Sequence, residues 1–206
     1  MNETVIIDYG MGNLRSVEKA LMAVGDQAVI SEDPEVVRHS DRLILPGVGA
    51  FGDAMSNLKQ AGLDLAIRDA VAEGKPLLGL CLGLELLFSE SEEFGRHEGL
   101  NLIPGHVRKF EETALRVPHV GWNQIESLRP DPLLENLPDG SYFYFVHSFF
   151  VEPDRSDDAL AWTNYGGPFC SIARHENVWG AQFHPEKSQD AGKRLLRNFL
   201  DLQDPF

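Results

Sequence analysis

One cysteine lies in a setting that suits a nucleophile. The segment Gly79-Leu80-Cys81-Leu82-Gly83 follows an apolar run and precedes a helical pattern, like the Gly-x-Ser-x-Gly elbow between a strand and a helix. The glycines permit a strained turn that exposes the side chain, and the amino end of a helix favours the thiolate. A small cysteine buried in a core strand is the alternative. The glycines and the strand-to-helix context favour a catalytic Cys81.

A nucleophilic cysteine needs a base, and His184 is the best placed of seven histidines. It follows an apolar run, and in His184-Pro185-Glu186 an extended backbone puts the imidazole and the carboxyl on one face. Glu186 can then accept from one ring nitrogen while the other meets Cys81, as in a catalytic triad. A surface turn is the alternative for this segment taken alone.

Backbone amides beside the nucleophile can form an oxyanion hole. The N–H of Leu82 follows Cys81 directly, and Pro46-Gly47-Val48-Gly49 follows another apolar run. In a parallel sheet such a loop opens beside the neighbouring strand end, so Gly47 and Val48 are the expected second donors.

A nucleotide site is a weaker interpretation of the amino-terminal glycines. Gly10-Met11-Gly12 follows an apolar run, and Glu32 lies about 20 residues further on, where a ribose-binding acid is expected. Arg15 stands where the dinucleotide fingerprint needs its third glycine, which makes this interpretation a minor alternative.

The elements that must position these residues alternate between strands and helices in the first half. Such strands need crossover connections, so the pattern predicts an α/β fold with a parallel sheet and helices on both faces. Expected strands are Thr4–Asp8, Ala28–Ile30, Leu43–Leu45, Pro76–Leu80, Val107–Phe110, Tyr142–Phe150, Ser171–Arg174 and Val178–Phe183. Expected helices are Leu14–Val24, Phe51–Gln60, Leu63–Ala72 and a last one with Ala191, Leu195, Phe199 and Leu202 on one face.

Three segments carry more specific expectations. The polar stretch Ser89–Glu98 is predicted to be a solvated loop. The aromatic run Tyr142–Phe150 is predicted to be one buried strand rather than a cofactor site. Ser188 is expected to cap the last helix.

Length and composition limit the number of domains and the classes of binding partner. The 206 residues, without repeats or a clear linker, indicate one domain over residues 1–206. A net charge of −14 argues against binding a nucleic-acid backbone or an anionic membrane. No apolar run approaches the roughly 18 residues of a membrane span, and no amino-terminal apolar segment resembles a signal sequence. We expect a soluble, cytoplasmic chain whose two cysteines stay reduced.

Seven segments together resemble one family over about Val5 to Leu200. Leu45–Gly49, Gly79–Gly83 and His184–Ser188 resemble the oxyanion loop, nucleophile elbow and base–acid segment of class I (triad-type) glutamine amidotransferases. Ile7–Leu14, Ser91–Glu93, Pro118–Asn123 and Tyr144–Ser148 resemble the glutaminase subunits of imidazole glycerol phosphate synthases.

The resemblance implies a three-layer α/β domain with a mostly parallel open sheet and added antiparallel strands. Cys81 would attack the side-chain amide of glutamine, form a glutamyl thioester and release ammonia, with His184 as base and then acid and Glu186 orienting it. No cofactor or metal is implied. The implied partner is a (β/α)₈-barrel cyclase subunit, which receives the ammonia through a tunnel for histidine biosynthesis.

The resemblance also assigns interface and substrate positions. Asn13 and the segment with Pro118, Gly121, Trp122 and Asn123 match family positions near the partner interface.

Glu85 departs from the family, which usually has a substrate-binding glutamine four residues after the nucleophile. An ionised Glu85 should repel the carboxylate of the substrate and disfavour a Cys81 thiolate; a solvated Glu85, or one paired with arginine, would do neither. Two other functions remain open: an amidotransferase that feeds a different synthase, and a non-catalytic docking subunit.

Overall fold

The computed structural model describes residues 3–111, 116–127 and 129–202. Within these residues, twelve strands form one mixed sheet and two more form a separate antiparallel pair. The strands are β1 (Thr4–Ile7), β2 (Val29–Ser31), β3 (Arg42–Gly47), β4 (Leu77–Cys81), β5 (Phe88–Ser91), β6 (His97–Glu98), β7 (Ile103–Lys109), β8 (His119–Gln124), β9 (Glu126–Ser127), β10 (Tyr142–His147), β11 (Phe149–Pro153), β12 (Ala159–Asn164), β13 (Pro168–His175) and β14 (Val178–Ala181).

Six α-helices and three short 3₁₀ turns connect these strands within the described residues. The helices are α1 (Leu14–Ala23), α2 (Pro34–His39), α3 (Phe51–Gln60), α4 (Leu63–Ala72), α5 (Leu82–Leu87) and α6 (Gln189–Leu200), and the 3₁₀ turns are η1 (Pro132–Leu134), η2 (Ser156–Asp158) and η3 (Pro185–Lys187). The longest has 12 residues, well short of the roughly 20 that cross a bilayer.

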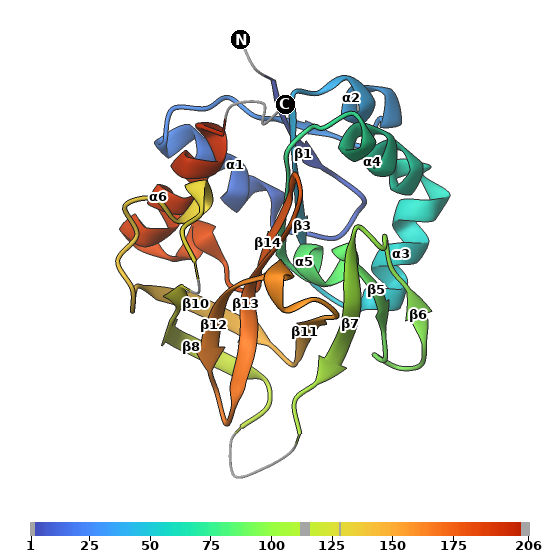
Figure 1. The fold of residues 1–206 in the computed structure, drawn as a ribbon. Helices are drawn as coiled ribbons and strands as arrows, with labels where there is room; N and C mark the ends of the chain where they lie inside the picture. The colour runs from blue at the N-terminus through green and yellow to red at the C-terminus, as the bar shows by residue number, and fades with distance from the viewer. Residues whose placement is uncertain (1–2, 112–115, 128, 203–206) are drawn as a thin grey trace.

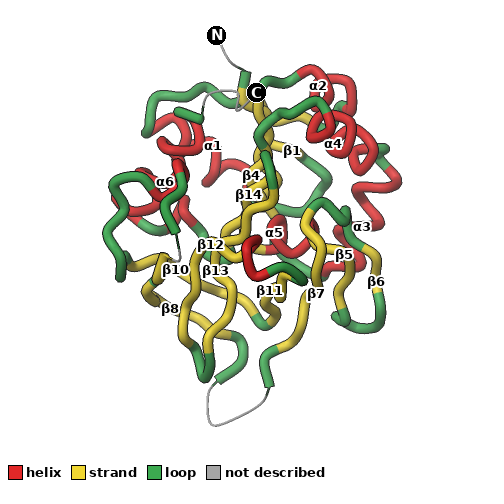
Figure 2. Tube along the Cα trace, in the orientation of Figure 1, coloured by secondary structure: helices red, strands yellow, loops and turns green. Residues whose placement is uncertain are grey.

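The parallel half of the sheet has the order β2-β1-β3-β4-β14, and β13 then continues it in antiparallel fashion. Helices α1 and α6 lie on one side of these strands, and α2, α3 and α4 lie on the other (Figure 1). The strands β7, β8, β10, β11, β12 and β13 make up a strand-rich end of the molecule (Figure 2). The predicted α/β class with a parallel sheet covered on both faces is confirmed.

The two faces follow from the period of two along each strand. In β1, Val5 and Ile7 join the buried cluster under α3 and α4, whereas Ile6 joins the cluster under α1 and α6. In β3, Leu45 joins the cluster under α3 and α4, and Ile44 joins the cluster under α1 and α6. Strands buried on both faces read as continuous apolar runs, which is why they stand out in the sequence.

The prediction of a solvated loop over Ser89–Glu98 is wrong. Ser89, Glu90 and Ser91 belong to β5, which pairs with β6 and runs parallel to β7. At this end of the described sheet β6 is the edge strand; β5 lies next to it, and its Ser89 and Glu90 are half-buried, so this segment lacks the apolar pattern of a strand buried on both faces.

The prediction of one buried strand over Tyr142–Phe150 is also wrong. The run divides at Ser148 into β10 and β11. Among the described residues β10 pairs with β8 alone, whereas β11 belongs to the main sheet. Tyr142 is 54% exposed. The aromatic residues therefore serve two sheets, and β10 buries only one of its faces.

Candidate active site

The turn between β4 and α5 holds Cys81 in a strained backbone conformation. Its φ of 54° and ψ of −110° lie outside the regions that residues with a side chain usually occupy. The flanking glycines make the turn possible. A Cβ on Gly83 would overlap the carbonyl oxygen of Leu45, and a Cβ on Gly79 would lie 2.6 Å from the carbonyl oxygen of Gly83. This geometry supports a nucleophile elbow at Cys81.

His184 is hydrogen-bonded to Glu186 in a buried pair. Its Nδ1 lies 2.8 Å from Oε1 of Glu186, and the two side chains are only 5% and 2% exposed. Because a carboxylate only accepts, Nδ1 carries the proton and Nε2 keeps a lone pair. Nε2 has no hydrogen-bond partner in the described part of the chain, so it is free to take a proton.

The backbone that brings these two side chains together differs from the expected one. Within this segment His184 has an extended backbone, whereas Pro185–Lys187 forms the turn η3. The carboxyl of Glu186 reaches the imidazole across this turn. Ser188 occupies the N-cap position of α6, as expected, but its side chain makes no capping hydrogen bond there. Its Oγ donates to the carbonyl of His184 at 2.6 Å and accepts from the N–H of Tyr144 at 3.0 Å. The N–H of His184 donates to Tyr144 O at 2.9 Å, so β10 holds the base in place.

Cys81 and His184 line the same pocket, which has a volume of about 320 Å³. The rest of its lining is Val48, Gly49, Leu82, Glu85, Glu93, Pro118, Val146, His147, Ser148 and Phe149. A larger hollow of about 690 Å³ lies along residues 127–139, but the described residues that line it include no cysteine or histidine. The smaller pocket is therefore the candidate active site.

The three expected oxyanion donors surround Cys81. Gly47 is its direct neighbour in the parallel register of β3 and β4. Val48 and Leu82 line the pocket, and a hydrogen bond from the N–H of Leu82 acts to lower the pKa of the thiol. This placement is compatible with the expected hole, and the roles of Gly47, Val48 and Leu82 remain predictions.

Burial decides the protonation state of the nucleophile. It raises the pKa of the Cys81 thiol far above its ordinary value, an ionised Glu85 raises it further, and the N–H of Leu82 opposes both only in part. The N–H at the helix end thus acts toward the thiolate, as expected, but burial outweighs it. Cys81 is a thiol at neutral pH, and its proton must leave as it attacks.

Glu85 is buried, and within the described residues no arginine pairs with it. It is 5% exposed, lines the pocket, and accepts a hydrogen bond from Nε2 of Gln182 at 2.9 Å. Burial raises the pKa of Glu85 to about 8, and Glu93 adds to the rise while Gln182 opposes it. Our expectation of an ionised Glu85 is therefore wrong at pH 7, where the carboxyl is mostly protonated.

Glu93 is a pocket residue to which sequence reasoning gave no role. Its Oε2 accepts from the N–H of Phe51 at 2.6 Å, so it anchors the start of α3 while it lines the pocket. No local pattern signals a contact across 42 residues.

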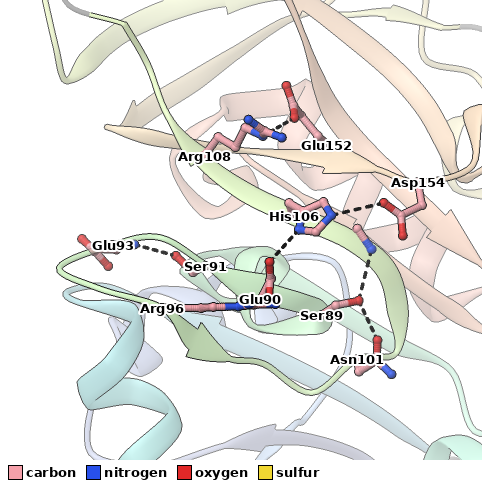
Figure 3. A network of polar contacts seen from close by, with 11 residues as sticks. Ser89, Glu90, Ser91, Glu93, Arg96, Asn101, His106, Arg108, Glu152 and Asp154 are labelled. Atoms are coloured by element: carbon pink, nitrogen blue, oxygen red, sulfur yellow. Dashed lines mark hydrogen bonds and ion pairs between the residues drawn. The ribbon is translucent and has the colours of Figure 1, made fainter.

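Figure 3 shows how the segment that carries Glu93 is held. Glu90 in β5 pairs with Arg96 and with Nδ1 of His106 in β7, and Nε2 of His106 lies 3.6 Å from Asp154. The N–H of Glu93 itself donates to Oγ of Ser91 at 3.2 Å.

The structure places the expected interface residues on different elements, and their role at an interface remains a prediction. Trp122 in β8 is 46% exposed, whereas the side chain of Asn123 turns inward and donates to the carbonyl of Asn164 at 3.0 Å. Pro118 lines the pocket. Asn13 is exposed and precedes α1, outside the β8–β10 sheet that contains Gly121.

Comparisons with known proteins agree with this geometry. The family model "Glutamine amidotransferase class-I" matches residues 5–202. The chain is 51% identical to "Imidazole glycerol phosphate synthase subunit HisH" of Syntrophotalea carbinolica, over 96% of this chain and 99% of that protein. It is 51% identical to the HisH subunit of Sulfurimonas denitrificans, over 97% and 98% of the two chains, and 46% identical to that of Geobacter sulfurreducens, over 98% and 100%.

Solved structures match the fold at low sequence identity. One, "Crystal structure of glutamine amidotransferase", superposes with a TM-score of 0.76 at 23% identity, covering 96% of this chain and 97% of the other. Another, "Structure of PurLQS from Thermotoga maritima", has a TM-score of 0.77 at 17% identity and covers 97% of each chain. With the matches over the whole sequence, these findings show that the chain belongs to the class I glutamine amidotransferase family, among its HisH-type members.

Proposed function

We propose that this chain is the glutaminase subunit of an imidazole glycerol phosphate synthase, which hydrolyses glutamine to glutamate and ammonia and passes the ammonia to a cyclase subunit. The observation that carries the proposal is the joint placement of Cys81 and His184 in one pocket, with His184 hydrogen-bonded to Glu186 at 2.8 Å. The HisH relatives support the choice of synthase.

The first half of the reaction forms a thioester. Nε2 of His184 takes the thiol proton of Cys81 as Sγ attacks the side-chain amide carbon of glutamine. The N–H of Leu82, with those of Gly47 or Val48, holds the negative oxygen of the tetrahedral intermediate. His184 returns its proton to the amide nitrogen, the carbon–nitrogen bond breaks, and ammonia leaves.

The second half restores the enzyme. His184 takes a proton from a water molecule, whose oxygen attacks the thioester carbon. The carbon–sulfur bond breaks, the proton returns to Cys81, and glutamate is released. Glu186 keeps the proton of His184 on Nδ1 throughout, so that Nε2 faces the reacting atoms.

We assign the two pocket carboxyls to substrate binding. Glu85 lies on the first turn of α5, next to the nucleophile, and its protonated form can both donate and accept a hydrogen bond. Glu93 offers a carboxylate on another part of the pocket wall, where it can accept from the ammonium group of glutamine.

The outer face of β8 and β10 is the surface we assign to the cyclase, a (β/α)₈-barrel that forms a heterodimer with this chain. Val120, Trp122 and Tyr142 are 56%, 46% and 54% exposed. Cross-strand pairing places Val120 opposite Val146 and Trp122 opposite Tyr144, so these side chains share one face. An exposed face with large aromatic side chains suits a protein interface.

Glutamate release tests this function. The rate is measured for the isolated chain, for the chain with the cyclase subunit, and for the complex with its cyclase substrate. Coupled glutamate release and imidazole glycerol phosphate formation are expected in the full complex. No glutamate release in any of these states, from a folded chain, would mean a non-catalytic docking subunit. Glutamate release without cyclase activity, together with activity toward another synthase, would favour the paralogous function.

The proposal includes a cytoplasmic location, where Cys81 and Cys170 stay free thiols.

A further inference from the structure

Two histidines that take no part in this mechanism are hydrogen-bonded to each other beside the pocket. His119 in β8 and His147 in β10 face each other in the antiparallel register. Nδ1 of His119 lies 3.0 Å from Nε2 of His147, and the two residues are 3% and 6% exposed. Of these two histidines, His147 lines the pocket and His119 does not.

The partners of the two rings fix the direction of every hydrogen bond. Nδ1 of His147 lies 2.6 Å from the carbonyl oxygen of Phe149, which can only accept, so Nδ1 carries a proton. A neutral ring has one N–H, so Nε2 of His147 accepts from Nδ1–H of His119. Nε2 of His119 then accepts from the amide of Asn123 at 3.3 Å. The chain of donors runs from Asn123 through both rings to Phe149.

Aromatic rings pack against both imidazoles. The ring of His119 stacks between those of Phe145 and Tyr165, with centroids 4.9 and 3.9 Å away. The ring centroids of Phe110 and Phe169 lie 5.3 and 5.1 Å from that of His147.

The same surroundings keep both rings neutral. Burial lowers the pKa of His119 to about 4 and that of His147 to about 3.

His147 belongs to the corner at which β10 ends and β11 begins. Val146, His147, Ser148 and Phe149 form this corner, and all four line the pocket. The carbonyl oxygen of Val146 lies 3.8 Å from Sγ of Cys81. The hydrogen bond from His147 to Phe149 O closes the corner, and the one from His119 holds His147 in the orientation that makes this possible.

We propose that His119 is a positioning residue for glutamine hydrolysis: by donating to His147, it fixes the Val146–Phe149 corner that forms the pocket wall beside Cys81. This inference rests on the proposed glutaminase function. It gives a role to two histidines of the Pro118–Asn123 and Tyr144–Ser148 segments, which the triad mechanism leaves unused.

Two substitutions separate the hydrogen bond from the packing. His119→Phe keeps an aromatic ring between Phe145 and Tyr165 but leaves Nε2 of His147 without its donor. His119→Asn keeps a donor near the position of Nδ1. In the complex with the cyclase, kcat/KM for glutamine should fall about tenfold in His119→Phe, the effect of one lost buried hydrogen bond, and recover to within about threefold of the wild type in His119→Asn.

Synthesis from free ammonium salts should be unchanged in both variants, because it bypasses the pocket. His175→Phe is the matched control. It also removes a histidine hydrogen bond, to Asp158 at 3.0 Å, but lies outside the pocket lining and should leave kcat/KM unchanged. The inference is overturned if His119→Phe hydrolyses glutamine as well as the wild type, or if His119→Asn is no better than His119→Phe. An inactive wild-type complex would instead refute the proposed function.

A measurement on the unmodified chain covers the case in which the variants do not fold. Nitrogen NMR of the histidine rings should find both His119 and His147 protonated on Nδ1, the less common tautomer of free histidine. An Nε2-protonated ring at either position would contradict the inference.

Discussion

Gln182 donates a hydrogen bond to Glu85 across 97 residues of sequence, from Nε2 to Oε1 at 2.9 Å. Both side chains are buried, and Glu85 faces the pocket that contains Cys81. Because burial raises the pKa of Glu85 to about 8, its carboxyl carries a proton at pH 7. A protonated carboxyl has one donor and one acceptor side, as the side-chain amide of glutamine does. Glu85 thus reproduces the usual family residue as long as it stays neutral.

Glu85→Gln should therefore change activity in a pH-dependent way. Near pH 6.5 the variant and the wild type should have similar kcat/KM values for glutamine. Above pH 8 the wild-type carboxyl ionises, repels the substrate carboxylate and disfavours the Cys81 thiolate, so the variant should gain roughly fivefold to tenfold by pH 9. Glutamate release by the complete complex from pH 6 to 9 measures this ratio.

Stability provides a second measure of the same substitution. The pKa of folded Glu85, about 8, exceeds its ordinary value of 4.5, so the native state binds more protons between these values and wild-type stability falls as pH rises through them. This fall in the free energy of unfolding is at most about 1.4 kcal/mol per pH unit, and Glu85→Gln should remove it. Glu98→Gln, on the exposed edge strand β6, is the control. In the activity measurement, a ratio of variant to wild-type kcat/KM that stays constant from pH 6 to 9 would show that Glu85 does not titrate near 8.

Cys81→Ala should abolish glutamine-dependent synthesis and leave synthesis from ammonium salts intact. The reason is that, in the proposed function, chemistry on glutamine is confined to this chain, so ammonia supplied from solution does not need Cys81. Both rates are measured in the assembled complex. Retained use of glutamine by the variant would refute the assignment of the nucleophile.

Trp122→Ala should weaken binding of the cyclase more than it weakens folding. The indole is 46% exposed and makes an edge contact with Tyr144 at 6.1 Å, so little buried area is lost within the chain. We expect the dissociation constant of the complex to rise at least tenfold with little change in melting temperature. Leu65→Ala, at an exposed apolar residue of α4, should leave the affinity unchanged. A large drop in the melting temperature of the isolated variant would identify Trp122 as a core residue instead.

Gly83→Ala should destabilise the fold by more than about 2 kcal/mol, since its Cβ would overlap the carbonyl oxygen of Leu45 and force β3 away from α5. Urea unfolding measures the loss. Gly167→Ala is the control, because no atom lies within 4 Å of the added Cβ. Equal stability of the two variants would mean that the elbow can relax at no cost.

The buried histidine pair should make stability fall in acid. Burial lowers the pKa values of His119 and His147 to about 4 and 3, below the ordinary 6.5, so below pH 6.5 the unfolded chain binds protons that the native state excludes. Each histidine removes at most about 1.4 kcal/mol per pH unit between 6.5 and its folded value. His119→Phe should show a shallower loss than the wild type in urea unfolding from pH 7.5 to 4.5. Identical slopes for the two proteins would contradict the buried, neutral state of His119.

Much of the fold and of the site follows from local sequence. The strands β1, β3 and β4 are continuous apolar runs, and the bounds of α3 and α4 coincide with the predicted helices. The elbow at Cys81 follows from its two glycines, and the His184–Glu186 contact is possible because two residues in sequence cannot lie far apart. These signals are short-range, so one sequence contains them.

Other features depend on chain segments that meet only in the folded molecule. The short strands β5 and β6 at the end of the sheet have no apolar period. The division of Tyr142–Phe150 between two sheets depends on which strands pair with each half. The partners Gln182 and Glu93 reach the pocket across 97 and 42 residues. Glutamate at position 85 was visible in the sequence, but its protonation was not, since desolvation by the surrounding elements sets that pKa. The sequence by itself determined which groups can react, and only the tertiary structure decided how buried, and therefore how charged, each of them is.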